Sequence, residues 1–273
     1  MTLRILDTFS GIGGFSLAAR WLGGFETVQF VEWDPYCQRI LSKNFPSIPI
    51  HGDITTFHPA EGAADVVCGG FPCQDISVAG KQAGIKQGTR SGLFYELMRV
   101  ICVVRPQYVV LENVAAILAN GLDTVLGELA EAGFDAEWAC IPASAVGACH
   151  QRDRWWLVAY ANNSDITARK FEHKQQGQTI ATDGSGNGNA PYANSFGVQR
   201  SKRYWAHRAP WSQTHFRCLS PSWQQYESEP VLRRGDDGLS NRVDRLKALG
   251  NSVVPQVAMI PLRRVLDLHH AKC

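Results

Sequence analysis

Residues 3–22 read LRILDTFSGIGGFSLAARWL. The apolar run at 3–6 predicts a short strand, and the apolar spacing of residues 15–22 predicts a helix. Between them lie residue types that cap helices, followed by glycines that let the backbone approach a ligand at the helix N-terminus. This order of strand, glycine-rich turn and helix favours nucleotide binding, although a plain turn has a similar composition.

Acidic residues follow the next two strand-like runs. Glu32 comes after residues 26–31 and lies about twenty residues beyond the glycine loop, where such folds hydrogen-bond a ribose diol. Asp53 comes after residues 48–50, and an adenine amino group would suit it as a partner. Each acid alone also fits a helix cap or a solvated loop charge. Their recurrence at successive strand ends favours a ligand that contains adenosine.

A cysteine follows the fourth predicted strand. Residues 64–68 lead into GGFPCQ at 69–74, so Cys73 begins a glycine-rich loop. The thiol is a candidate nucleophile, and the alternative is a small buried hydrophobic residue. Glu112 follows another strand-like run at 107–111. Because parallel strands end at one edge of a sheet, we expect Cys73, Glu112 and the glycine loop to meet there.

Strand-like and helix-like segments alternate as far as about residue 160. The later strands are expected at 136–141 and 155–160, and the helices at 93–104 and 122–132. Such alternation predicts an α/β fold with a doubly wound, mostly parallel sheet and ligands at the carboxyl ends of its strands.

The chain changes character after this region. Residues 161–191 are rich in Asn, Gln, Gly, Thr and Ser, as linkers are. An apolar-periodic helix is expected from about Val254 to His269, with Pro255 in its first turn. We therefore divide the chain into a catalytic and cofactor-binding domain at 1–160, a second domain at 161–243, and a C-terminal segment at 244–273 that returns to the first domain.

The second segment has a distinctive charge pattern. Residues 184–226 contain no Asp or Glu, while aromatic residues alternate with basic ones at Arg200, Lys202, Arg203, Arg208 and Arg217. This pattern suits phosphate contact and base recognition. A small aromatic core with a solvated basic face would look the same, so both interpretations stay open on these residues alone.

The composition limits the size of the core, the compartment and the kinds of partner that we expect. At 273 residues and 45% apolar, the chain can bury an α/β core and a small second lobe, and its net charge of +2 does not by itself indicate a polyanionic partner. No apolar run has membrane-spanning length and no signal peptide is visible, so we expect a cytoplasmic protein. The eight cysteines form no C-x-x-C pair, which argues against a zinc site or a disulfide framework.

Taken in order, the motifs resemble those of the C5-cytosine-specific DNA methyltransferases of bacteria and phages. They are DTFSGIGG at 7–14, EWD at 32–34, GDI at 52–54, GFPCQ at 70–74, ENV at 112–114, QRDR at 151–154 and GNSVVP at 250–255. The resemblance implies a Rossmann-like catalytic domain, S-adenosylmethionine as methyl donor, and a small target recognition domain at 161–243. It also implies a role in a restriction–modification system, on double-stranded DNA, as a monomer without a metal.

The chemistry of the base then suggests roles for four residues. C5 of cytosine is a poor nucleophile, so the Cys73 thiolate must first add at C6. Glu112, if burial raises its pKa, can donate a proton or hydrogen bond at N3. Arg154 would contact the cytosine O2, and Arg152 would brace the loop after Cys73. None of this fits inside a stacked duplex, so we expect the base to be flipped out.

The resemblance also implies two binding sets. The donor pocket is expected to comprise Phe9, Gly11, Ile12, Gly14, Glu32, Trp33, Asp53, Ile54, Phe71, Leu93, Asn251, Ser252 and Val253. The expected DNA contacts are Gln74, Arg200, Lys202, Arg203 and Arg208.

Three other functions stay open. An RNA (tRNA) cytosine-5 methyltransferase would share every catalytic motif. A nicotinamide dehydrogenase would explain the glycine loop and Glu32 but not Cys73 with Glu112. A non-catalytic nucleic-acid-binding module is the third, and the intact nucleophile and acid speak against it.

Overall fold

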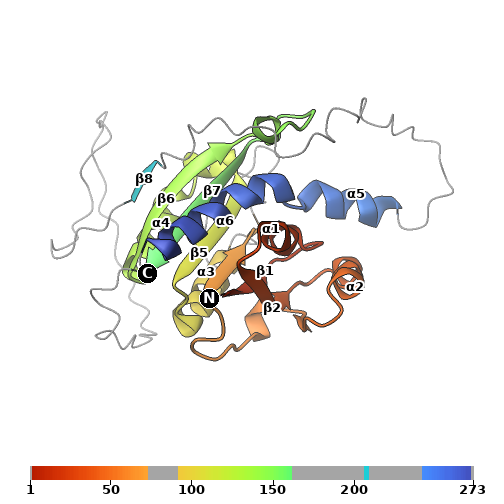
Figure 1. The fold of residues 1–273 in the computed structure, drawn as a ribbon, viewed down its shortest axis with the longest axis horizontal. Coiled ribbons are helices and arrows are strands. Elements are labelled where there is room, and N and C mark those ends of the chain that lie inside the picture. Colours follow the sequence, from red (N-terminus) through yellow and green to blue (C-terminus); the bar gives the residue numbers. More distant parts are fainter. Residues whose placement is uncertain (1, 73–91, 162–205, 209–241, 272–273) are drawn as a thin grey trace, which may run out of the picture.

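A computed structural model describes residues 2–72, 92–161, 206–208 and 242–271, and these ranges build one sheet with helices on both faces (Figure 1). The order of its eight strands is β3-β2-β1-β4-β5-β7-β6-β8. The strands are β1 (Leu3–Thr8), β2 (Phe25–Val31), β3 (Ile50–His51), β4 (Val66–Gly69), β5 (Tyr108–Val114), β6 (Phe134–Ile141), β7 (Arg154–Ala161) and β8 (Ala206–Arg208).

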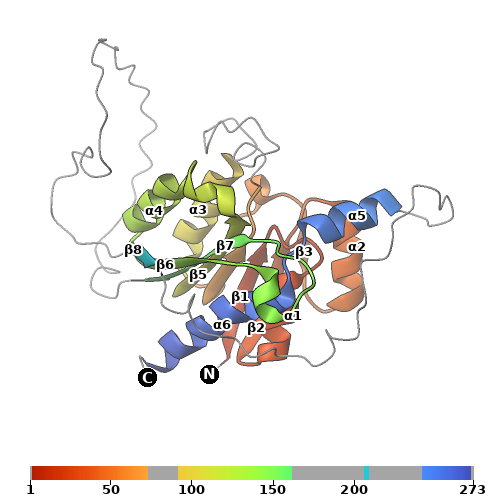
Figure 2. The ribbon, with the colours of Figure 1, turned by 90° about the horizontal axis from the view of Figure 1, so that it is seen from above.

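The helices cover the sheet in two layers. They are α1 (Gly14–Leu22), α2 (Pro35–Asn44), α3 (Leu93–Val104), α4 (Leu122–Glu131), α5 (Arg242–Asn251) and α6 (Pro255–His270), with short 3-10 turns η1 (Ile54–Thr56), η3 (Ala115–Leu118) and η4 (Ala143–Val146). Figure 2 shows α1 and α6 on one face and α3 and α4 on the other. The predicted doubly wound, mostly parallel α/β fold is therefore confirmed.

The central strands are apolar on both sides because both of their faces are covered. Along β5, Tyr108 and Val110 pack into the cluster that contains the buried side of α6, while Val109 and Leu111 pack into the cluster beneath α3 and α4. Side chains of a strand alternate between faces, so a continuous apolar run fills both cores. This explains why the sequence signal at these strands is a run and not an alternation.

Strand β7 runs in the direction opposite to its neighbours. It is antiparallel to β5 and to β6, whereas the other paired strands are parallel. The connection from β6 to β7 carries only the short turn η4, which suits an antiparallel return and not a parallel crossover. As a consequence, Arg154 at the start of β7 pairs with Val114 at the end of β5.

Some segments depart from the predicted boundaries. The strand expected at 48–50 lies at Ile50–His51, and α2 starts where the Asp34 carboxylate accepts a hydrogen bond from the Tyr36 amide at 2.9 Å. Strand β8 extends the sheet beside β6 with residues of the segment 161–243. Most of that segment lies outside the described residues, so the domain division stays a prediction.

An ion pair fastens α6 to the sheet. Glu137 on β6 has a side chain that is only 1% exposed, and its Oε1 lies 2.5 Å from Nε of Arg264 on α6. The second guanidinium nitrogen reaches Oε2 at 3.4 Å. Because an unpaired buried carboxylate is costly, this contact contributes to the stability of the C-terminal helix on the fold.

Candidate active site

The carboxyl ends of β1, β4 and β5 lie side by side, as the sequence predicts. Thr8 is opposite Gly69, and Gly69 is opposite Leu111, so Glu112 stands one residue beyond this row. Gly70 leaves room for the acid here, because a Cβ atom on it would lie 3.1 Å from Oε2 of Glu112, closer than most Cβ contacts. The sheet therefore presents the glycine loop, the approach to Cys73 and the Glu112 carboxyl at one edge.

The glycine loop holds its backbone in a conformation that few other residues adopt. Gly11 has φ of 54° and Gly13 has φ of 88°, and Phe9 is a rare non-glycine residue with positive φ, at 50°. A Cβ atom on Gly11 would meet nothing within 4 Å, so this part of the loop faces open space among the described residues. Strain at a loop that opens onto free space is typical of ligand-binding turns.

Glu32 ties this loop to the end of β2. One carboxylate oxygen accepts a hydrogen bond from the Gly11 amide and the other accepts one from the Asp34 amide, both at 2.7 Å. Burial raises the pKa of Glu32, while these two amides act in the opposite direction. Each oxygen has a further lone pair, so Glu32 can still accept bonds from a ligand. Trp33 beside it is 73% exposed.

Four other predicted donor-pocket residues lie around α3 and η1. Asp53 caps η1, because its Oδ1 accepts a hydrogen bond from the Thr55 amide at 2.9 Å. A helix cap was the alternative to a ligand contact for this residue, and the cap is the contact that the structure contains. Ile54 and Phe71 are buried in the core cluster that includes α3, and Leu93 packs against that cluster. Ile12 is half-buried in the glycine loop.

Glu112 is a buried acid with a cationic neighbour. Its side chain is 12% exposed, and its Oε1 lies 3.1 Å from Nε of Arg154. Burial raises the pKa of Glu112 to about 7, although Arg154 and Arg152 both act to lower it. A carboxyl with this pKa holds its proton on about half of the molecules at neutral pH, which suits a general acid.

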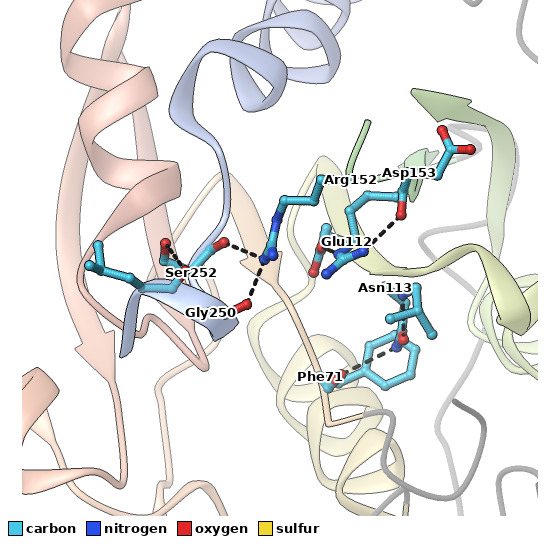
Figure 3. Close-up of polar contacts among 10 residues, drawn as sticks. Phe71, Glu112, Asn113, Arg152, Asp153, Gly250 and Ser252 are labelled. Carbon is cyan, nitrogen blue, oxygen red and sulfur yellow. Dashed lines mark hydrogen bonds and ion pairs between the residues drawn. The ribbon is translucent and has the colours of Figure 1, made fainter. Parts of the chain in front are cut away.

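Asn113 fastens the chain just ahead of Cys73. Its Nδ2 donates a hydrogen bond to the Phe71 carbonyl at 3.2 Å, and its Oδ1 accepts one from the Val114 amide at 2.8 Å (Figure 3). The side chain is buried, so both of its polar ends are satisfied inside the protein. It therefore fixes the end of β5 to the segment that leads from β4 to Cys73.

The C-terminal segment lies against the glycine loop. A Cβ atom on Gly14 would fall 2.8 Å from the carbonyl oxygen of Val253 and 3.0 Å from its Cβ. Ser252 and Val253 are half-buried and Asn251 is exposed. Arg152 reaches this segment from the other side and donates to the carbonyls of Gly250 and Ser252 (Figure 3).

Comparison with known proteins decides the family. A family model described as C-5 cytosine-specific DNA methylase matches residues 3–233. The chain belongs to this family. It is 32% identical over 186 residues to the Type II methyltransferase M.HhaI of Haemophilus parahaemolyticus, covering 66% of this chain and 56% of that protein. It is 31% identical over 207 residues to the Type II methyltransferase M.CviJI of Paramecium bursaria Chlorella virus IL3A, covering 71% and 54%.

The solved structures agree on the fold of this chain. A mutant of DNMT2 from Spodoptera frugiperda aligns with a TM-score of 0.50 at 22% identity, covering 64% of this chain and 54% of that chain. The chain spans about half the length of the curated relatives it matches.

The structure describes only part of the methylase site predicted from sequence. Glu112, Arg152 and Arg154 come together at one sheet edge, and the glycine loop, Glu32 and residues 251–253 lie beside one another. Residues outside the described part are Cys73, Gln74, Arg200, Lys202 and Arg203. Arg208 ends β8, and only its place in the sheet is described.

Sequence reasoning missed two polar residues near the site. Asp7 is fully buried at the end of β1, and burial raises its pKa to about 7, although Ser16 donates a hydrogen bond to its Oδ2 at 2.6 Å. Lys247 on α5 pairs with Asp34 at 2.8 Å and so joins the C-terminal segment to the residue after Trp33. An acid inside an apolar strand was a signal for Asp7, whereas nothing in the sequence indicated the partner of Lys247.

Two candidate features are absent from the part of the chain that the structure describes. No helix within the described ranges is long and apolar enough to cross a membrane. Within the same ranges, no group of three or more His, Cys, Asp or Glu side chains is placed to hold a metal ion.

Proposed function

We propose that the chain is a DNA (cytosine-5-)-methyltransferase that transfers a methyl group from S-adenosylmethionine to C5 of a flipped-out cytosine in a specific duplex sequence. The observation that carries the proposal is the buried Glu112 carboxyl, with a pKa of about 7, held against Arg154 at the edge that also carries the glycine loop. An acid that burial keeps protonated toward neutral pH can donate a proton or a hydrogen bond to N3 of a cytosine ring. The family membership supports the same reading.

The donor would be held at the glycine loop and the C-terminal segment. The open space at Gly11, the spare lone pairs of Glu32 and the exposed ring of Trp33 fit a ribose and an adenine ring. When bound there, S-adenosylmethionine supplies an electrophilic methyl group on its sulfonium. Further residues assigned to the pocket are Phe9, Ile12, Gly14, Asp53, Ile54, Phe71, Leu93, Asn251, Ser252 and Val253.

The protein's own groups carry the activation of the base. The Cys73 thiolate adds to C6, and the ring electrons released by that addition make C5 nucleophilic. The Glu112 carboxyl donates its proton or a hydrogen bond at N3, and the Arg154 guanidinium stabilises the charge that develops on O2. After C5 has gained the methyl group, a base removes the C5 proton, the C5–C6 double bond re-forms and Cys73 leaves.

We assign recognition of the target DNA sequence to the segment 161–243. This segment is rich in basic and aromatic residues. The residues that would contact DNA are Arg200, Lys202, Arg203 and Arg208 of this segment, together with Gln74 of the loop after Cys73. The base must leave the stack before Cys73 can reach C6. We place the enzyme in a restriction–modification system, acting as a monomer in the bacterial cytoplasm without a metal.

A transfer assay with labelled donor tests the proposal and its RNA alternative together. Duplex DNA that contains many different sequences and a mixture of tRNAs are incubated separately with the wild-type chain and with Cys73→Ala. The proposal expects label in the DNA alone, and it expects the variant to lose that label while its donor binding is retained. Label in tRNA alone would replace the DNA assignment with the RNA one, and turnover by the variant within tenfold of wild type would remove the nucleophile.

A further inference from the structure

Arg152 makes an unusual long-range contact. One guanidinium nitrogen, Nη2, donates to the carbonyl of Gly250 at 2.9 Å and to the carbonyl of Ser252 at 2.8 Å (Figure 3). These acceptors lie 98 and 100 residues further along the chain. Arg152 itself has φ of 36°, a left-handed conformation that is uncommon outside glycine. Such a conformation persists only where the surroundings enforce it.

The acceptors of Arg152 are groups that need a partner. Gly250 lies in the last turn of α5, where carbonyl oxygens have no partner within the helix. A cationic donor at a helix C-terminus satisfies these carbonyls and interacts favourably with the helix dipole. Arg152 therefore caps α5, while the Ser252 amide and hydroxyl both reach the Leu249 carbonyl, at 3.3 and 3.1 Å.

Helix α5 has little else to hold it among the described residues. From Asp244 to Gly250, only Ala248 is buried. The ion pair from Lys247 to Asp34 is largely exposed on the lysine side, with 62% of that side chain accessible, and exposed pairs stabilise weakly. The half-buried Arg152 contact is the better anchor, because charged donors to carbonyls in a partly desolvated place form the stronger hydrogen bonds.

Arg152 also stands between the two halves of the site. Two residues beyond it, Arg154 pairs with Glu112 on the side where the base would be activated. On the other side, the segment that it holds carries Val253, whose carbonyl lies where a side chain on Gly14 would be. The Arg152 side chain therefore holds the segment beside the glycine loop, while its backbone leads within two residues to the arginine that pairs with Glu112.

We propose that Arg152 is a positioning residue that anchors residues 250–253 against the glycine loop and so sets the donor site in register with Glu112. This role differs from bracing the loop after Cys73, which lies outside the described residues. The inference rests on the proposed function for its effect on donor affinity, whereas the anchoring itself is a property of the chain without any ligand.

Two measurements on the full chain test the inference. The first is hydrogen exchange without ligand: Arg152→Ala should speed exchange of the amides of residues 251–253 at least tenfold, with β1 and β4 unchanged. The second is calorimetric titration with S-adenosylhomocysteine, whose Kd should rise at least tenfold. Arg152→Lys keeps a cationic donor and should recover part of both effects, and it serves as the test variant if the alanine variant does not fold.

Arg105→Ala is the matched control. Arg105 is also an arginine with positive φ, at 52°, but it lies at the end of α3 and pairs with Glu61, an exposed partner on the surface. This control should leave exchange at 251–253 and the Kd within twofold of wild type. A merely structural loss would lower kcat with KM for the donor unchanged, because less of the protein would be folded, whereas a positioning role should raise KM for the donor by a larger factor than it lowers kcat.

The outcomes separate the two claims. Unchanged exchange at 251–253 together with an unchanged Kd in Arg152→Ala would overturn the positioning role. Faster exchange in a chain whose wild type binds no S-adenosylhomocysteine would uphold the anchoring and overturn the proposed function.

Discussion

The Glu112 carboxyl should make the protein less stable as the pH rises, and Glu112→Gln should remove this effect. The side chain is 12% exposed, and burial raises its pKa from 4.5 to about 7 in the folded state. Glutamine has the shape of the protonated carboxyl and can still accept a hydrogen bond from Arg154. The variant therefore serves as a copy of the protein in which the proton at this position never leaves.

The sign and size follow from proton linkage. Below about pH 4.5 the carboxyl is protonated in both the folded and the unfolded chain, so the substitution should change the free energy of unfolding little. The stability that the protonated carboxyl contributes is lost as the pH rises from about 4.5 to about 7, because over this range the unfolded chain gives up its proton while the folded chain still keeps it. The rise in pKa corresponds to about 3 kcal/mol, which is the expected gain of the variant at pH 9.

Urea unfolding of the wild type and the variant at pH 5, 7 and 9 measures the difference. Glu26→Gln is the control, because Glu26 is exposed on β2 and the same change there should alter stability little at any of the three values. Methyl transfer by Glu112→Gln should be much slower, with affinity for S-adenosylhomocysteine within threefold of wild type. A stability difference that is equal at pH 5 and pH 9 would refute the buried-acid reasoning.

Three further expectations concern the donor site, the C-terminal helix and sequence choice. Glu32→Ala should weaken S-adenosylhomocysteine binding by about 1–3 kcal/mol in calorimetric titration, and unchanged affinity would remove Glu32 from the donor site. Arg264→Ala should lower the free energy of unfolding by about 3 kcal/mol in urea because Glu137 stays buried without its partner, whereas the exposed neighbour Arg263→Ala should change it by less than about 0.5 kcal/mol; equal effects would contradict the ion-pair argument. Exchange of residues 161–243 with those of a relative of different specificity should move methylation to that relative's sequence in a genome-wide map, and an active chimera that keeps the original sequence would refute the assignment.

The sequence predicted the parts of the fold that depend on local chemistry. Apolar runs buried on both faces indicated the central strands, and the acids and glycines after them indicated the edge where they meet. The register Thr8 to Gly69 to Leu111 confirms that edge. Such predictions succeed because a parallel sheet brings its strand ends together whatever the rest of the chain does.

Other features depend on contacts that the sequence does not contain. Helix α5 is mostly polar and exposed, so its residues show little of the apolar spacing by which helices are recognised. The reversal of β7 follows from the short connection after β6, and it alone brings Arg154 opposite the end of β5. The partner of Arg152 lies about a hundred residues away and is a pair of backbone carbonyls, which no residue type can indicate.

Asp53 is a residue for which the sequence suggested a ligand contact and the structure contains a local structural contact. Its position after a strand suggested a ligand contact, and a cap on the next helical turn was the alternative. The structure contains the cap, with Oδ1 accepting from the Thr55 amide. Because capping occupies one oxygen and leaves the other, a donor contact at Asp53 stays a prediction.

Bisulfite sequencing of DNA from cells that express the chain tests the central claim most directly, since 5-methylcytosine resists conversion. Cells that express the wild type should retain unconverted cytosine at one short sequence throughout the genome, and cells that express Cys73→Ala should retain none above background. Complete conversion in the wild-type cells, with the protein folded and S-adenosylhomocysteine binding intact, would contradict the assignment of this chain as a DNA cytosine-5 methyltransferase.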